Sequence, residues 1–226
     1  MDDAQIFISF HSEVSFVRMI EESILPVRLK IDASIIPDDD SEVDEINNVF
    51  VKVKTWLDNI LSMGIAFSAT NETAIALFVH DNGMPVTDNT VLISPGEPTD
   101  ELLCALIHAK LNALGDGVIE FVNTKVVGDS DFRLSFCFEG DANDILPPHD
   151  EWLSNETFFD KPWWNRNDGT THDFPCEDSM VGIEPLWAIN FVIPDDVQEP
   201  TLDVAKKPKA KVQFAPIVIK GGKRKP

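Results

Sequence analysis

Two His-Asp steps contain the side chains of this chain that are best suited to holding a metal ion. His149 and Asp150 form the first step, and His172 and Asp173 form the second. Imidazole and carboxylate groups bind divalent metals, and a bound metal can activate water for hydrolysis. Their spacing matches no helical ligand motif such as HExxH, and in a chain with 39 acidic residues such neighbours also arise by chance. These four residues are therefore only weak metal candidates, and no cofactor is expected.

Cys104 and His108 form a second pair that could do chemistry. Their four-residue spacing places them on one face of an expected helix, as a nucleophile and its base would require. The alternative is a buried thiol beside a hydrogen-bonded imidazole. The chain contains no GxSxG, Walker or GxGxxG motif, and its acidic run 38–45 lacks the spacing and the central glycine of a calcium-binding loop. These observations predict a protein that is not an enzyme.

The aromatic segment 158–169 could bind a protein partner or a ligand. Three of the five tryptophans lie between Trp152 and Trp164, and Trp is enriched at binding hot spots. Trp163 and Trp164 are adjacent, so they cannot both point inward from a regular strand, and Arg166 could stack on an indole. The alternative is a long irregular loop that needs large side chains to anchor it to the rest of the fold.

Charge divides the chain into two parts of opposite sign. All 39 acidic residues and ten of the 18 basic residues precede residue 204, which leaves residues 1–203 with a net charge of −29. The remaining eight basic residues give residues 204–226 a net charge of +8: Lys206, Lys207, Lys209, Lys211, Lys220, Lys223, Arg224 and Lys225. An acidic body repels nucleic acid and membrane surfaces, whereas the basic tail could contact either an acidic protein or nucleic acid.

The tail also carries two short β-prone runs, Val212–Phe214 and Ile217–Ile219. Such a segment can add as a strand to the sheet edge of a partner, with its lysines on an acidic surface. The predicted partner-binding residues are those of the aromatic segment and the tail: Trp163, Trp164, Arg166, Lys206, Lys207, Lys209, Lys211, Phe214, Ile217, Ile219, Lys223 and Arg224. A disordered solubilising tail or a localisation signal is the alternative.

The elements that must position these residues follow from hydrophobic periodicity. Helices are expected at about 42–63 and 102–114, where apolar residues recur at helical spacing and Thr99 is a suitable cap before the second. The alternation of apolar and polar residues predicts the strands, and short runs of β-prone residues add others: 6–10, 14–17, 25–36, 74–80, 90–94, 118–127, 132–139 and 187–193. A short helix is expected near 150–155.

This order of elements predicts an α+β fold. We expect a two-layer sandwich in which two main helices cover one face of a mostly antiparallel sheet. Residues 1–140 would form this core, residues 141–193 an irregular Trp-rich segment that ends in a strand packed on the core, and residues 194–226 a linker with the extended basic tail.

The sequence favours a structural or assembly protein that binds other protein subunits, copies of itself included. A subunit of a bacteriophage tail or baseplate would have this character. The acidic N-terminus and the absence of a long apolar run predict a protein that stays in the cytoplasm, or in a virion assembled there. Two alternatives stay open: an acidic regulator that imitates nucleic acid, and a metal-dependent hydrolase that uses the His-Asp steps.

Overall fold

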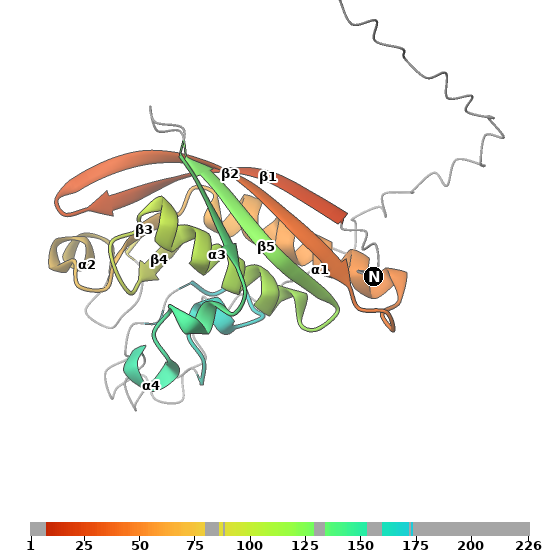
Figure 1. Ribbon diagram of the computed structural model, residues 1–226. Coiled ribbons are helices and arrows are strands. Elements are labelled where there is room, and N and C mark those ends of the chain that lie inside the picture. The colour runs from red at the N-terminus through yellow and green to blue at the C-terminus, as the bar shows by residue number, and fades with distance from the viewer. Residues whose placement is uncertain are drawn as a thin grey trace, which may run out of the picture. The chain divides into compact units, whose positions relative to one another are not determined.

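A long antiparallel hairpin forms the centre of the sheet (Figure 1). The computed structural model describes residues 8–79, 86–87, 89–128, 134–152, 160–171 and 173. The hairpin consists of β1 (Ile8–Ile20) and β2 (Ser23–Pro37), which pair along their full length. We expected two short strands in place of β1, but the alternation of buried and exposed residues continues through Ser12 and Glu13. Glu13 lies opposite Lys30, so opposite charges support the pairing at the expected break.

Four further strands extend the sheet in the order β4-β3-β1-β2-β5-β6. On one side β3 (Ile65–Ser68) and β4 (Val91–Ser94) add in parallel, and on the other β5 (Ile119–Gly128) and β6 (Ser135–Glu139) add antiparallel. The expected hairpin at 118–139 is therefore confirmed as β5 and β6. The register of β2 against β5 shifts between Ser34 and Ile35, which marks a β-bulge in the middle of the sheet.

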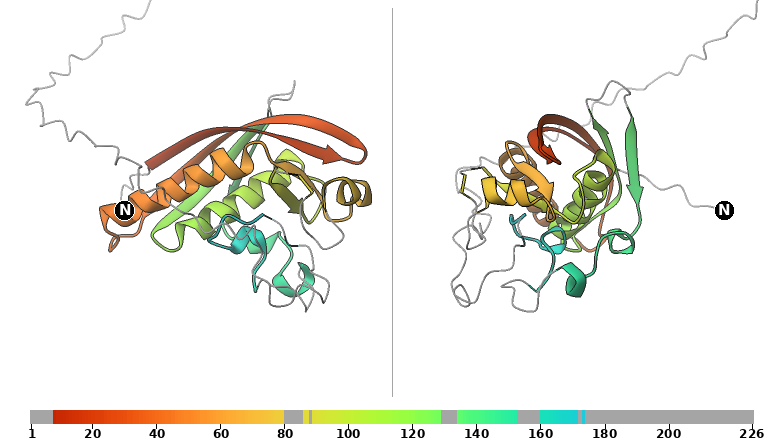
Figure 2. Two further views of the ribbon diagram at one scale, coloured as in Figure 1. Left: turned by 180° about the vertical axis from the view of Figure 1, so that it is seen from behind. Right: turned by 90° about the vertical axis from the view of Figure 1, so that its left-hand side faces the viewer.

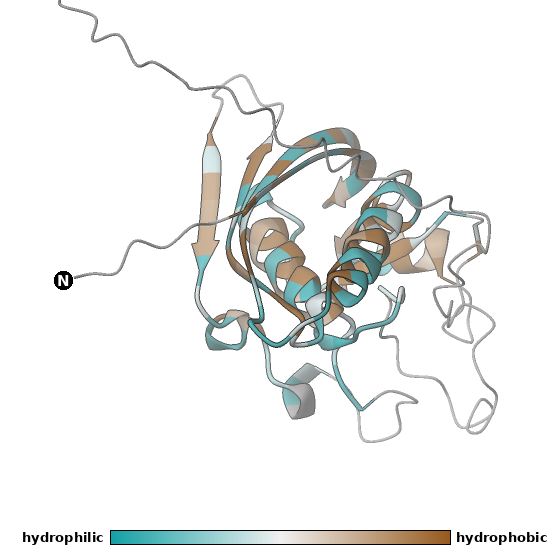
Figure 3. Ribbon diagram, turned by 90° about the vertical axis from the view of Figure 1, so that its right-hand side faces the viewer, coloured by the Kyte–Doolittle hydropathy of each residue, from teal (hydrophilic) through white to brown (hydrophobic). Residues whose placement is uncertain are grey.

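Two helices cover one face of this sheet, as Figure 2 shows from behind. Helix α1 (Val43–Thr55) continues into the π-helical turn η1 (Trp56–Leu61), and α3 (Asp100–Gly115) lies beside it. Thr99 caps α3 through its side chain, which accepts from the backbone of Leu102. The main core fills the space between these helices and the inward side chains of β1, β2 and β5. Figure 3 looks along the helices under the curve of the sheet and shows this layering.

The segment predicted as strand 74–80 is instead a helix, α2 (Glu72–Phe78). The side chain of Asn71 caps this helix by accepting from the backbone of Ala74 at 2.9 Å. Helix α2 contributes Ala74 to a second, smaller core on the opposite face of the sheet, with Met19 and Phe67. Strand β3 therefore has both faces buried, and β4 pairs in parallel with β3 rather than with the expected preceding strand.

The part of the chain after β6 that the structure describes has little regular secondary structure. It contains the 3-10 turn η2 (Ala142–Asp144), the short helix α4 (His149–Trp152) and the 3-10 turn η3 (Trp163–Asn165). The α+β class is confirmed, with a six-stranded mixed sheet in which three of five pairings are antiparallel. Among the described residues, no helix has the length and apolar character needed to cross a bilayer. The expected strand at 187–193 lies outside the described residues.

Candidate functional site

The two adjacent tryptophans lie in the main core. Trp163 is 1% exposed and Trp164 is 0% exposed, and both belong to η3. A 3-10 turn, unlike a strand, does not direct successive side chains to opposite sides, so both indoles can point inward. Trp163 Nε1 donates to the carbonyl of Ile93 in β4 at 2.7 Å, and the ring of Trp164 lies 5.1 Å from that of Trp152. This burial argues against a partner surface on the two indoles and fits their alternative role as anchors.

Arg166 is also part of the interior. Its side chain is 6% exposed, and its guanidinium pairs with the fully buried carboxylate of Asp173. The same guanidinium donates to the hydroxyl of Thr170 at 2.7 Å and to the carbonyl of Lys161 at 2.9 Å. A cation with these partners holds the segment 161–173 together and is not presented to a binding partner, which corrects the expectation for Arg166.

Lys110 on α3 fastens this segment to the core. The side chain is 0% exposed, and Nζ donates to the carbonyls of Trp163 at 2.9 Å, Arg166 at 2.8 Å and Thr170 at 3.3 Å. Burial lowers the pKa of Lys110 to about 7, although the nearby carboxylate of Asp168 acts in the opposite direction. The amine therefore titrates near neutral pH rather than near its ordinary pKa of 10.5.

Asp173 is occupied by hydrogen-bond donors rather than by a metal. Besides Arg166, its carboxylate accepts from Trp152 Nε1 at 2.8 Å and from the backbone of Trp163 at 2.6 Å. No group of three or more potential metal ligands gathers within the part of the chain that the structure describes. The side chains of His149 and Asp150 and the whole of His172 lie outside the described residues, so the predicted metal set is not brought together here.

Cys104 and His108 each bind backbone or hydroxyl groups of the sheet. Cys104 Sγ lies 3.2 Å from the carbonyl of Thr124, and burial raises the pKa of Cys104 to about 11. His108 Nδ1 lies 3.0 Å from Thr124 Oγ1, and Nε2 lies 3.1 Å from the carbonyl of Gly140. Burial also lowers the pKa of His108. A protonated thiol and a neutral imidazole with both nitrogens engaged do not make a nucleophile and its base.

Asn112 completes a row of polar residues on α3 that hold other segments. Its side-chain amide donates to the carbonyl of Phe121 at 3.0 Å, and its oxygen accepts from the Phe121 backbone at 2.9 Å. His108, Lys110 and Asn112 are polar residues within an otherwise largely apolar stretch of the sequence. That pattern was the available signal for their role, because a polar residue in a helix buried on most sides must find partners in the interior.

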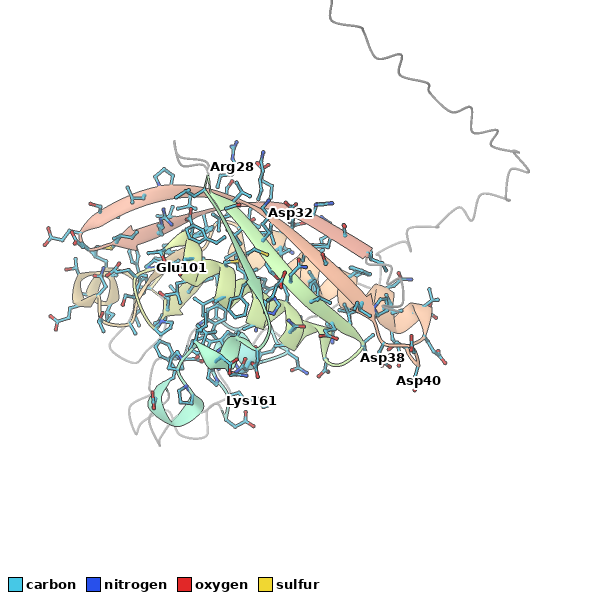
Figure 4. The ribbon with its side chains drawn as sticks, in the orientation of Figure 1. Arg28, Asp32, Asp38, Asp40, Glu101 and Lys161 are labelled. Carbon is cyan, nitrogen blue, oxygen red and sulfur yellow. The ribbon has the colours of Figure 1, made fainter. Side chains whose placement is uncertain are left out.

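A groove opens beside His108 between α3, β5 and the segment after β6. Its volume is about 830 Å³, and the polar side chains among its lining residues belong to His108, Asn112, Glu120, Asp141, Asn143, Lys161 and Asn165. Lys161 is labelled in Figure 4 at this end of the molecule. The groove contains acids, amides and one exposed cation, but the imidazole at its base is already satisfied.

The predicted binding residues of the tail lie outside the described residues. They are Lys206, Lys207, Lys209, Lys211, Phe214, Ile217, Ile219, Lys223 and Arg224. Their role therefore stays a prediction from sequence.

Comparisons with known proteins supply no family for this chain. No protein-family model matches it, and no curated protein matches its sequence. One solved structure with a similar chain is Plasmodium vivax 6-pyruvoyltetrahydropterin synthase, determined as a catalytic-residue mutant. The two chains are 9% identical over 60% of this chain and 98% of the other, with a TM-score of 0.37. A similarity at this level carries no argument about function.

Proposed function

We propose that this chain is a non-enzymatic assembly protein whose acidic body binds basic segments of other protein subunits. The subunits can include copies of the chain itself, because residues 204–226 carry a net charge of +8 and residues 1–203 a net charge of −29. Opposite charges of this size accelerate association and favour correct partners over other acidic proteins.

The observation that carries the proposal is the internal use of basic residues. Of the ten Lys and Arg residues in the body, Lys110 and Arg166 are buried, so they contribute little to the charge presented at the surface. Other basic residues are paired with acids: Arg18 with Asp100 at 2.6 Å, Arg28 with Glu13 at 3.4 Å, and Lys54 with Asp58 at 2.6 Å. Each such pair removes an acid together with a base, so the net charge stays as the composition gives it, and the exposed acids that remain unpaired make the surface acidic.

Exposed acids without such pairing gather at two places. The first is the turn between β2 and α1, where Figure 4 labels Asp38 and Asp40 at one end of the sheet. The second follows β6 and consists of Glu139, Asp141 and Asp144, all exposed. Both are in reach of a basic partner from solvent, unlike Trp163 and Trp164. In the proposed role these acids replace the aromatic segment as the contact surface.

The experiment measures association of the full chain by sedimentation at low and high salt. We expect concentration-dependent association at 50 mM NaCl that weakens at least tenfold at 500 mM, because exposed ion pairs are screened. Glutamine at Lys206, Lys207, Lys209 and Lys211 together should weaken it at low salt. Glutamine at Lys52 and Lys54 of α1 is the matched control and should not. A full chain that stays monomeric at low salt and captures no basic protein refutes the proposal.

A further inference from the structure

The two edges of the sheet differ in how far other described segments of the chain cover them. At β4, the backbone of Ile93 donates to the carbonyl of Thr171 at 3.2 Å. Thr171 Oγ1 donates to the carbonyl of Val91 at 2.7 Å, and Trp163 Nε1 donates to the carbonyl of Ile93 at 2.7 Å. The segment 163–171 therefore covers the β4 edge, as proteins commonly do to prevent strands from pairing with other chains.

The opposite edge, β6, has no such cover from the residues that the structure describes. Strand β6 is the last in the sheet and pairs only with β5 (Figure 2, right). Its five residues, Ser-Phe-Cys-Phe-Glu, include neither proline nor lysine, the residues that most often make an edge unsuitable for pairing. As far as the described residues are concerned, the row of backbone donors and acceptors beyond β6 is available to a further strand.

The side chains of β6 also leave apolar surface incompletely covered. Phe136 and Phe138 point toward the main core but are only partly buried, and Phe138 lies 5.1 Å from the ring of His108. Leu134, which immediately precedes the strand, is 57% exposed. A seventh strand with apolar side chains on its inner face would cover this surface, because neighbouring strands place their side chains about 5 Å apart.

We propose that the free edge of β6 accepts the segment Pro216–Lys220 of this chain as a seventh strand. The inference rests on the proposed function, because it names the acceptor for the basic arm. The segment Pro-Ile-Val-Ile-Lys matches the five residues of β6 in length and is rich in β-branched residues. Proline is tolerated at the first position of an edge strand, and Gly221-Gly222 ends the run.

Charge supports the same acceptor. Basic residues flank the segment on both sides, at Lys211 and at Lys223. The acids Glu139, Asp141 and Asp144 lie at and just beyond the end of β6. Either direction of the added strand therefore brings a basic flank to this acidic group, and the pairing of opposite charges favours docking at β6.

Cys137, exposed at the centre of β6, provides a test in the full chain. Cysteine is placed singly at Ile217, Val218 or Ile219 in a Cys176→Ser background, and disulfide formation with Cys137 is followed by peptide mapping. Side chains of an added strand alternate between the two faces of the sheet. Positions 217 and 219 would then share one face, and position 218 would lie on the other. The rate of disulfide formation at 218 should therefore be at least about tenfold faster, or at least about tenfold slower, than the rates at 217 and 219. Ala205→Cys is the matched control outside the segment and should link slowly.

The result separates this inference from the proposed function. Equal linking rates at the three positions, or rates no faster than the Ala205→Cys control, overturn the seventh strand. Linkage within one molecule and linkage between two copies both support the acceptor edge, and electrophoresis tells them apart. If the full chain associates in a salt-dependent way but shows no alternating linkage, the assembly role stands and the acceptor is wrong. If alternating linkage occurs in a chain that neither associates nor captures a partner, the acceptor stands and the assembly role fails.

Discussion

The buried amine of Lys110 makes the stability of the fold depend on pH near neutrality. Its pKa is lowered by burial to about 7, whereas the unfolded chain should show the ordinary value near 10.5. Between these two values the unfolded state binds one proton more than the folded state. The free energy of unfolding therefore rises with pH across this window, with a limiting slope of about 1.4 kcal/mol per pH unit.

The range from pH 7.5 to 8.5 isolates this effect. Integrating the linkage relation over that unit gives an increase of about 1 kcal/mol from Lys110 alone. Cys104 opposes it only weakly in this range, because burial raises its pKa to about 11 and the unfolded thiol, with its ordinary pKa of 9.0, is still mostly protonated below pH 8.5. His108 has its pKa lowered and titrates in the unfolded chain near 6.5, below the range.

The measurement is urea unfolding followed by circular dichroism at several pH values from 7.5 to 8.5. Wild type should gain about 1 kcal/mol, and Lys110→Met should lose this increase, since methionine does not titrate. Methionine also leaves the carbonyls of Trp163, Arg166 and Thr170 without their donor, but that change is independent of pH. Lys125→Met, at an exposed position on β5, is the matched control and should keep the increase. The reasoning is refuted if Lys110→Met retains the slope, or if wild type loses stability as pH rises.

Three further predictions concern other buried groups. His108 should destabilise the fold as pH falls below about 6.5, because protonation favours the unfolded chain, and His108→Gln should flatten that acid limb in the same urea assay. The Cys104 thiol should stay unlabelled by a thiol reagent at pH 8 until urea unfolds the protein, as peptide mapping would show; rapid labelling in the native state would contradict its burial. Gly128→Ala should lower stability by about 1–3 kcal/mol, because a Cβ there would lie 2.1 Å from Asp100 Oδ2, whereas Gly96→Ala, with its nearest neighbour at 3.6 Å, should change unfolding little.

Elements with strong local signals were predictable, and those decided by tertiary contacts were not. Helix α3 begins after its Thr99 cap and ends at Gly115, where the sequence placed both signals. Helix α2 was mistaken for a strand because seven residues with several apolar side chains fit either period. Its cap at Asn71 was the distinguishing signal, and the second core that selects the helix forms only once β3 and β4 are in place.

The candidate site was harder to predict because exposure is a property of the whole fold. Adjacent tryptophans were expected to present at least one indole to solvent, an argument that holds for a strand but not for the 3-10 turn that they form. Arg166 was expected near an indole at the surface, and no local pattern in the sequence pairs it with Asp173 seven residues later. Their segment is also hydrogen-bonded to Lys110, more than fifty residues earlier in the chain.

The internal use of basic residues links the stability of this fold to its proposed role. Lys110 and Arg166 satisfy buried carbonyls and a buried carboxylate, so the same contacts that anchor the segment 161–173 keep two basic side chains from the surface. An exposed basic side chain can form an ion pair with a partner, whereas a buried one cannot contact it. Replacing Lys110 should therefore change unfolding with little effect on salt-dependent association, whereas replacing the tail lysines should change association and leave unfolding unaltered. If either replacement changed both the free energy of unfolding and the salt-dependent association, the same charges would serve anchoring and recognition. The separate roles assigned to buried and exposed basic residues would then be wrong.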